Sequence, residues 1–72
     1  MTYKVTWLDI QGHYNEDINK PYNEYLCECY TIGEEIIADE TTTLVIYGGS
    51  TEDDEKSFDA IPNGAITLIE EI

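Results

Sequence analysis

The strongest constraint on the fold of this chain is the stretch from Glu24 to Gly49, where most of the apolar and β-branched residues stand in short runs. These runs are four to eight residues long and are interrupted by Gly33, by the polar segment 39–42 and by Gly48 with Gly49. Apolar runs with such interruptions are typical of short strands joined by tight connections. We therefore expect this stretch to form the middle of a sheet.

The N-terminal residues show the alternation of a half-buried strand. Tyr3, Val5 and Trp7 would share one face of that strand, with polar residues between them on the other face. Leu8 and Ile10 are then expected to pack beneath an edge or a loop. The segment from Gln11 to Asn23 has no sustained period and is rich in Gly, Asn, Asp and Pro, which predicts a long loop.

A second strand is expected from Tyr25 to Ile32. If Cys27, Cys29 and Thr31 point inward, Leu26 and Tyr30 point outward among carboxylates. A face of that mixed character suits a protein partner. The alternative is a central strand covered on both faces, in which Leu26 and Tyr30 belong to the core.

Three further connections are read from turn residues. Gly33 predicts a turn after which 34–38 runs back as a hairpin strand, and the segment 39–42 predicts the turn into a strand at 43–47. The Asn63-Gly64 pair predicts a hairpin between a strand through Phe58 and Ala60 and a last strand at 65–70. Pro62 is expected at the edge of the sheet.

The sequence thus predicts one domain spanning residues 1–72, mainly β, with an antiparallel sheet of four to six short strands. One short helix near residues 51–58 is compatible with the acidic segment there, since Ser50 or Thr51 is a suitable N-cap. That helix would make the fold α+β, which is the alternative. A chain of 72 residues can bury only a small core.

No group of residues points to catalysis or to a bound cofactor. His13 is the only histidine and has no nucleophile near it in sequence, so a solvent-exposed or loop-anchoring histidine is expected. Cys27 and Cys29 offer two ligands where zinc needs four, which favours a buried thiol pair over a metal site. The acidic runs lack the pattern of a calcium loop. We therefore expect a protein that is not an enzyme and holds no metal or cofactor.

Compartment and membrane association are also read from composition. Two cysteines close in sequence are too few for a disulfide framework, and the N-terminus lacks the features of an export signal. No apolar run is long enough to span a bilayer. The expected location is the cytoplasm, without membrane contact.

Charge is the property that bears most on function. The chain has 16 acidic residues against three Lys and no Arg, a formal charge of −13. Direct binding to nucleic acid is not expected, because the sequence offers no basic patch to displace counterions. Conversely, a folded acidic surface imitates the phosphate backbone and is steered towards proteins whose cationic grooves bind nucleic acid.

The residues expected to contact such a partner are acidic clusters that supply charge and tyrosines that supply anchors. They are Glu34, Glu35, Asp39, Glu40, Asp53, Asp54, Glu55, Tyr14, Tyr22 and Tyr30. In size and charge the chain resembles the small acidic inhibitors that bacteriophages use against host restriction and CRISPR nucleases. The resemblance implies a DNA-mimic inhibitor acting in the host cytoplasm to evade host defence, and it carries no particular residue over to this chain.

Two other interpretations compete with mimicry. The chain is alternatively a small β-sheet interaction module or an assembly subunit that pairs through strand edges, including with a second copy of itself as a homodimer. Binding of that kind would depend little on salt, whereas mimicry predicts binding that weakens steeply as salt rises. The plainest interpretation is that the charge only keeps a small domain soluble.

Neutralising the acidic segment tests the charge hypothesis. Changing Asp53, Asp54 and Glu55 together to Asn, Asn and Gln should leave folding intact but slow association with the target, because steering depends on net charge. Stopped-flow association rates at low ionic strength measure this effect. An unchanged rate would count against this segment as a contact.

Overall fold

The computed structural model describes residues 1–49 and 55–72, and these residues form the mainly β architecture that the sequence predicts. They contain six short antiparallel strands, two 3-10 turns and no α-helix. The strands are β1 (Tyr3–Asp9), β2 (Cys27–Gly33), β3 (Glu35–Ala38), β4 (Thr42–Gly49), β5 (Lys56–Pro62) and β6 (Ile66–Glu71), and the turns are η1 (Tyr22–Tyr25) and η2 (Asn63–Ala65). Of the segment 51–58 considered for a helix, 51–54 lie outside the described residues and 56–58 belong to β5.

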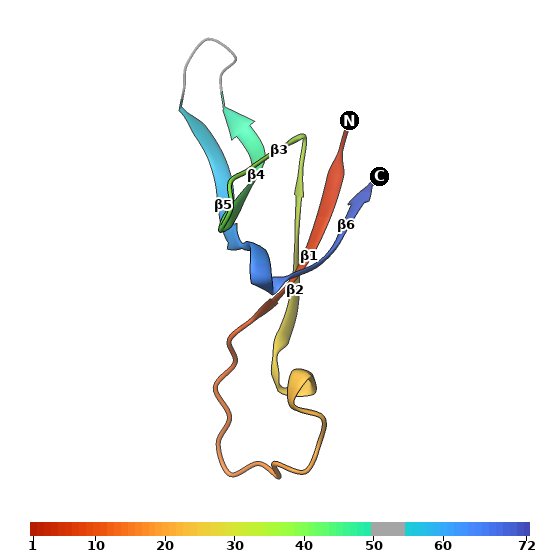
Figure 1. Ribbon diagram of the computed structural model, residues 1–72, viewed down its shortest axis with the longest axis vertical. Helices are drawn as coiled ribbons and strands as arrows, with labels where there is room; N and C mark the ends of the chain where they lie inside the picture. Colours follow the sequence, from red (N-terminus) through yellow and green to blue (C-terminus); the bar gives the residue numbers. More distant parts are fainter. Residues whose placement is uncertain (50–54) are drawn as a thin grey trace.

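The strands form two three-stranded sheets and not the single sheet that we expected. Their orders are β2-β1-β6 and β3-β4-β5, and the chain passes between the sheets after β2 and returns through η2 (Figure 1). Two sheets allow each to bury one face against the other, which a single exposed sheet cannot do. The loop between β1 and β2 extends away from both sheets, and the molecule measures 51 × 22 × 21 Å.

The hairpin predicted at Gly33 is wrong, because β3 pairs with β4 and not with β2. Gly33 is required for close packing instead of for a turn. A Cβ added to it would lie 2.5 Å from the carbonyl oxygen of Ile46. The next residue, Glu34, donates its backbone N–H to that same oxygen at 2.9 Å. The end of β2 therefore packs directly against the backbone of β4.

The hairpin predicted at Asn63-Gly64 is also wrong, since β6 pairs with β1 and not with β5. Asn63 instead ties η2 to the turn between β3 and β4. Its side chain accepts a hydrogen bond from the Thr43 hydroxyl at 2.6 Å and donates one to the carbonyl oxygen of Asp39 at 3.0 Å. Its backbone N–H donates to the carbonyl oxygen of Thr41 at 2.9 Å. These tertiary bonds outweigh the local preference of Asn-Gly for a two-residue turn.

The core between the sheets is small. Val5 from β1, Val45 from β4 and Ile61 from β5 are almost completely buried and contact one another. Trp7 packs against this cluster on the face that the alternation of β1 predicts. Ile10 was expected to pack beneath an edge, but it is 90% exposed because the loop leads away from the sheets.

Polar side chains also join the two sheets. Trp7 donates its indole N–H to the hydroxyl oxygen of Thr31 at 3.3 Å, and Thr31 donates its hydroxyl to the carboxylate of Asp59 at 2.7 Å. The other oxygen of Asp59 accepts a hydrogen bond from the Tyr47 hydroxyl at 3.2 Å. The negative charge of Asp59 raises the pKa of Tyr47. This chain of bonds links β1 and β2 in one sheet to β4 and β5 in the other.

Substitution of Gly33 by Ala should destabilise the protein, because the new methyl group would collide with the backbone of β4. Forced overpacking of this kind costs about 1–3 kcal/mol. The measurement is the free energy of unfolding from urea titration, followed by Trp7 fluorescence. Gly12→Ala is the matched control, since no atom lies within 4 Å of its added Cβ. Equal stability of the two variants would contradict the close contact between β2 and β4.

Candidate protein-binding surfaces

Acidic residues cover the outside of the described protein. Every described Asp and Glu is exposed except Asp59, which is half-buried in the bonds that join the sheets. Within the described residues the ion pairs engage two carboxylates, those of Glu16 with His13 and of Glu35 with Lys56. Most of the negative charge is therefore free to interact with a partner.

The predicted acidic contacts that the structure describes gather around the second sheet. Glu34 and Glu35 lie where the chain enters β3, and Glu55 lies just before β5. Asp39 and Glu40 occupy the turn that leads from β3 to β4. All five residues are exposed, whereas Asp53 and Asp54 lie outside the described residues. The structure thus places carboxylates at both ends of the β3-β4-β5 sheet.

Asp39 also has a structural task. One of its carboxylate oxygens accepts hydrogen bonds from the backbone N–H groups of Thr41 at 2.9 Å and Thr42 at 2.8 Å. These bonds lower the pKa of Asp39 and keep it anionic. They also close the turn at 39–42 that the sequence predicts, since Asp side chains commonly bond the backbone in this way.

The three candidate tyrosines are all strongly exposed but lie in two different places. Tyr14, 88% exposed, and Tyr22, 79% exposed, belong to the segment between β1 and β2. Tyr30, 63% exposed, lies on the outward face of β2, where Lys4 is 4.7 Å from its ring centre. Because β2 is an edge strand with Leu26 and Tyr30 exposed, the alternative of a central strand covered on both faces is wrong.

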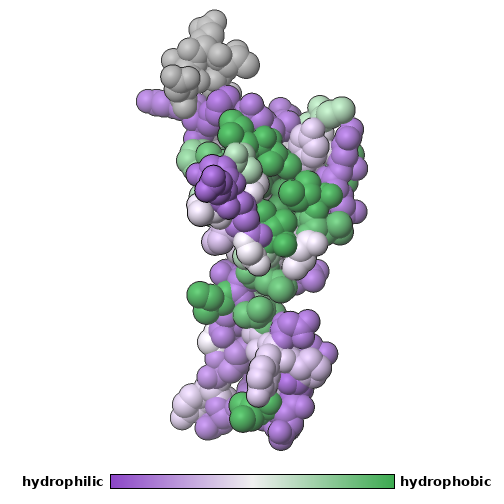
Figure 2. All heavy atoms as spheres, in the orientation of Figure 1, coloured by the Kyte–Doolittle hydropathy of each residue, from purple (hydrophilic) through white to green (hydrophobic). Residues whose placement is uncertain are grey.

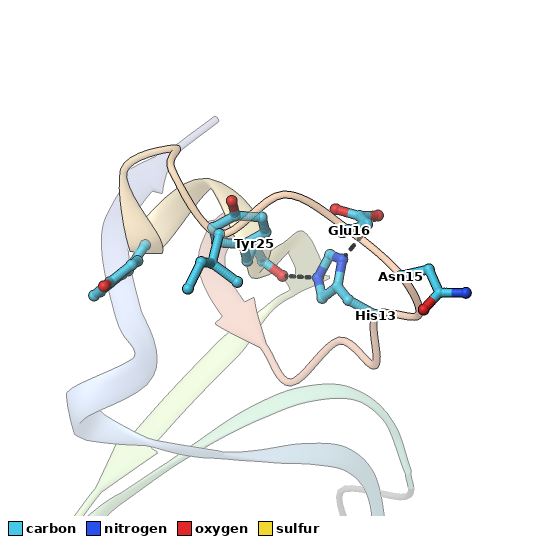
Figure 3. Close-up of a pocket in the computed structure, with 6 residues that line it drawn as sticks. His13, Asn15, Glu16 and Tyr25 are labelled. Atoms are coloured by element: carbon cyan, nitrogen blue, oxygen red, sulfur yellow. Dashed lines mark hydrogen bonds and ion pairs between the residues drawn. The ribbon is translucent and has the colours of Figure 1, made fainter.

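The loop between β1 and β2 is anchored by His13. Its Nε2 lies 2.7 Å from the carbonyl oxygen of Tyr25 and its Nδ1 lies 3.1 Å from the carboxylate of Glu16 (Figure 3). Asn15 adopts a positive φ of 53°, which this residue type tolerates, and the resulting turn directs Glu16 back to the histidine. Both ring nitrogens face acceptors, so the arrangement favours the protonated imidazole, and the Tyr25 carbonyl and then Glu16 raise the pKa of His13.

A pocket of about 370 Å³ lies beside this anchor. Its lining is His13, Asn15, Glu16, Ile18, Tyr22 and Tyr25. Tyr25 donates its hydroxyl to the carbonyl oxygen of Asp17, which holds the far side of the loop against η1. These bonds fit the loop-anchoring role expected of His13. Within the described residues no nucleophile accompanies the histidine at hydrogen-bond distance.

The cysteines differ from the expected buried pair. Cys27 is exposed and Cys29 is half-buried, because their part of β2 extends beyond the second sheet. Their sulfur atoms are 3.8 Å apart. Burial, and then the hydrogen bond with Cys27, raises the pKa of Cys29, so its thiol stays protonated and is a poor nucleophile. Among the described residues no cluster of three or more metal-binding side chains occurs.

Sequence reasoning missed an apolar surface on the second sheet. The face of β3-β4-β5 that points away from the core carries Ile37, Leu44, Ile46, Phe58 and Ala60, which we call the outer apolar face. Figure 2 shows that apolar residues reach the surface in the sheet-containing part of the molecule, with hydrophilic residues around them. Glu35, Ile37 and Asp39 stand at every second position and so share one face of the strand, but this spacing alone does not say whether that face is covered.

The total accessible surface is large for a chain of this mass. It is 5678 Å² for a chain of 8.2 kDa. The scaling of surface with mass for folded monomers gives about 4,500 Å², so the excess is roughly 1,100 Å². The extended loop and the open sheet faces contribute to it. A standard protein interface covers about 800 Å² on each partner.

Comparisons of this chain with protein-family models, with curated proteins and with solved structures found no match. In the described part of the chain, no helix has the length and apolar character needed to cross a membrane.

The His13 anchor predicts a pH dependence of the loop. A raised pKa in the folded state stabilises that state below the unfolded value near 6.5, and the contribution is lost as the pH rises through the folded pKa. Hydrogen-exchange protection of the loop amides, corrected for intrinsic rates, should therefore fall above the pKa of His13. An NMR titration should place that pKa above 6.5, and Glu16→Gln should lower it. A pKa at or below 6.5 would contradict the anchor.

Proposed function

We propose that this chain is a non-enzymatic acidic inhibitor that binds the cationic, nucleic-acid-binding groove of another protein, such as a nuclease. The proposal is carried by one observation: the described carboxylates are exposed, with the exception of Asp59, and most have no cationic neighbour. A charge of −13 on a folded scaffold attracts cationic grooves over a long range. Lys and Arg that normally bind phosphate then pair with carboxylates.

Long-range charge raises the association rate more than the affinity, so a mimic also needs apolar contacts. The exposed side chains of Tyr14, Tyr22 and Tyr30 are suited to this role, because tyrosine combines a large apolar ring with a polar tip.

A β-sheet interaction module without mimicry is the second candidate. It is favoured by the exposed apolar residues on both sheets, such as Phe58 at 45% and Leu68 at 51% exposure. The two candidates differ in how affinity responds to salt, because apolar contacts are insensitive to the screening that weakens ion pairs.

Affinity capture at stepped salt tests the proposal. Immobilised protein is incubated with a bacterial lysate at low ionic strength, and bound proteins are eluted with rising salt and identified by mass spectrometry. We expect proteins with nucleic-acid-binding grooves to elute over a narrow salt range and to be displaced by DNA or RNA. A variant with Glu34→Gln, Glu35→Gln and Glu40→Gln, which removes three of the proposed charged contacts, should release the captured proteins at lower salt. Capture that resists both salt and polynucleotide would exclude mimicry and favour the interaction module.

A further inference from the structure

We propose that the outer apolar face of the β3-β4-β5 sheet is the docking surface of this protein and that its occupant is a basic amphipathic helix of the partner. The inference rests on the proposed function, in that the partner is cationic, and it adds where the partner binds and by which kind of element.

The strand register defines this face. Glu35 is opposite Ile46, which is opposite Phe58, and in the next row Ile37 is opposite Leu44, which is opposite Ala60. Neighbouring residues in each strand point to opposite sides. Ile36, Val45 and Ile61 therefore point to the other sheet, where they are packed in or against the core. The row that contains Ile46 and the row that contains Leu44 face away from the other sheet.

Exposure divides the face into a floor and walls. Ile46 is 6% exposed and forms the floor, whereas Ile37 at 48% and Phe58 at 45% rise on either side. A hollow of about 250 Å³ adjoins Ile37 and Leu44 and is bounded by Ala38, Asp39 and Thr42. This volume is below the roughly 300 Å³ at which small-molecule pockets begin, so it suits one apolar side chain of a protein better than a free ligand.

Charges at the ends of the face select a basic partner. Glu35 lies at one end, where it pairs with Lys56 at 3.6 Å, and Asp39 with Glu40 lies at the other. The backbone bonds from Thr41 and Thr42 keep Asp39 anionic. A second copy of this chain would bring a further charge of −13 to these carboxylates, which opposes self-association through this face.

The centre of this face suits a helix better than an added strand, which would need the free edge of β3 or β5. β4 is paired on both sides, by β3 and β5, so the centre of the face offers side chains and no free ladder bonds. A helix needs none, because its backbone groups bond internally. Three strands about 4.8 Å apart make a strip roughly 10 Å wide, which is the diameter of a helix.

Lengthwise spacing agrees with this occupant. Glu35 is the first residue of β3 and Asp39 directly follows its last, so the length of the strand, about 13 Å, separates them. Two turns of helix span about 11 Å, so Lys or Arg residues seven or eight positions apart can reach both ends. Apolar residues at the intervening third and fourth positions would then lie along Ile37, Leu44 and Phe58.

A designed peptide tests the docking surface directly. The probe is an 18-residue peptide of Leu and Lys with an amphipathic helical pattern, and its control is a peptide of the same composition in scrambled order. In NMR spectra of the wild-type protein we expect the largest amide shifts at Ile37, Leu44 and Phe58, and tighter binding of the patterned peptide. Because this NMR mapping uses the wild-type protein, its outcome does not depend on the folding of any variant.

Paired variants measure the contribution of the face. The double substitution Ile37→Ser, Phe58→Ser removes two exposed apolar side chains and should weaken peptide binding by about tenfold or more, because that apolar area is no longer buried. The matched control, Ile32→Ser with Leu68→Ser, removes exposed apolar side chains from the other sheet and should change affinity by less than about twofold. Circular dichroism checks that both variants fold.

Three outcomes would overturn the inference. Amide shifts confined to the β2-β1-β6 sheet or to the β1–β2 loop would place the site elsewhere. Equal binding of the patterned and scrambled peptides would show that charge alone acts. A wild-type dimer in sedimentation that the Ile37→Ser, Phe58→Ser variant abolishes would make a second copy the occupant.

Salt-stepped capture separates failure of this inference from failure of the proposed function. If the Ile37→Ser, Phe58→Ser variant captures the same groove-containing proteins as strongly as the wild type, the docking surface is wrong and the inhibitor function stands. If the wild-type protein captures no such proteins, the proposed function itself fails.

Discussion

The contact between two thin sheets through Val5, Val45 and Ile61 is the interaction on which this structure depends. So few buried side chains give little stability to oppose a net charge of −13, and the chain compensates with bonds outside the apolar cluster. Thr31 reaches from one sheet to the carboxylate of Asp59 on the other. The absence of a side chain at Gly33 lets the end of β2 lie against β4. Packing and polar bonding together fix the sheets to each other.

This architecture has a consequence for function. Two three-stranded sheets that bury one face against each other leave two faces outside, and the chain has no α-helix in its described residues to cover them. Apolar side chains such as Phe58 consequently remain in contact with water, between carboxylates at the ends of the same strands. A surface of that composition is complementary to an apolar stripe with flanking Lys and Arg, which is the kind of partner that we propose.

The acidic residues and tyrosines proposed as contacts could be chosen from the sequence, because charge and aromatic character are properties of single residues. Their positions relative to one another could not. The sequence gives no measure of the distance between Glu35 and Phe58, which come together only because β4 lies between their strands. Ile37 and Leu44 were expected in the sheet without any role in binding, since an apolar residue in a strand usually points to the core. The position of the other sheet decides that these two do not.

The sequence alone determined the β class, the turn at 39–42, the alternation of β1 and the acidic exterior, because each follows from local periodicity, turn chemistry or composition. Tertiary structure decided which strands pair. Gly33 and Asn63 each favour a local hairpin, yet both serve contacts between distant segments, with β4 in one case and with the β3–β4 turn in the other. The physical reason is that two stacked sheets bury apolar area that no sequence of local hairpins would bury, and this gain exceeds the preference of any single turn.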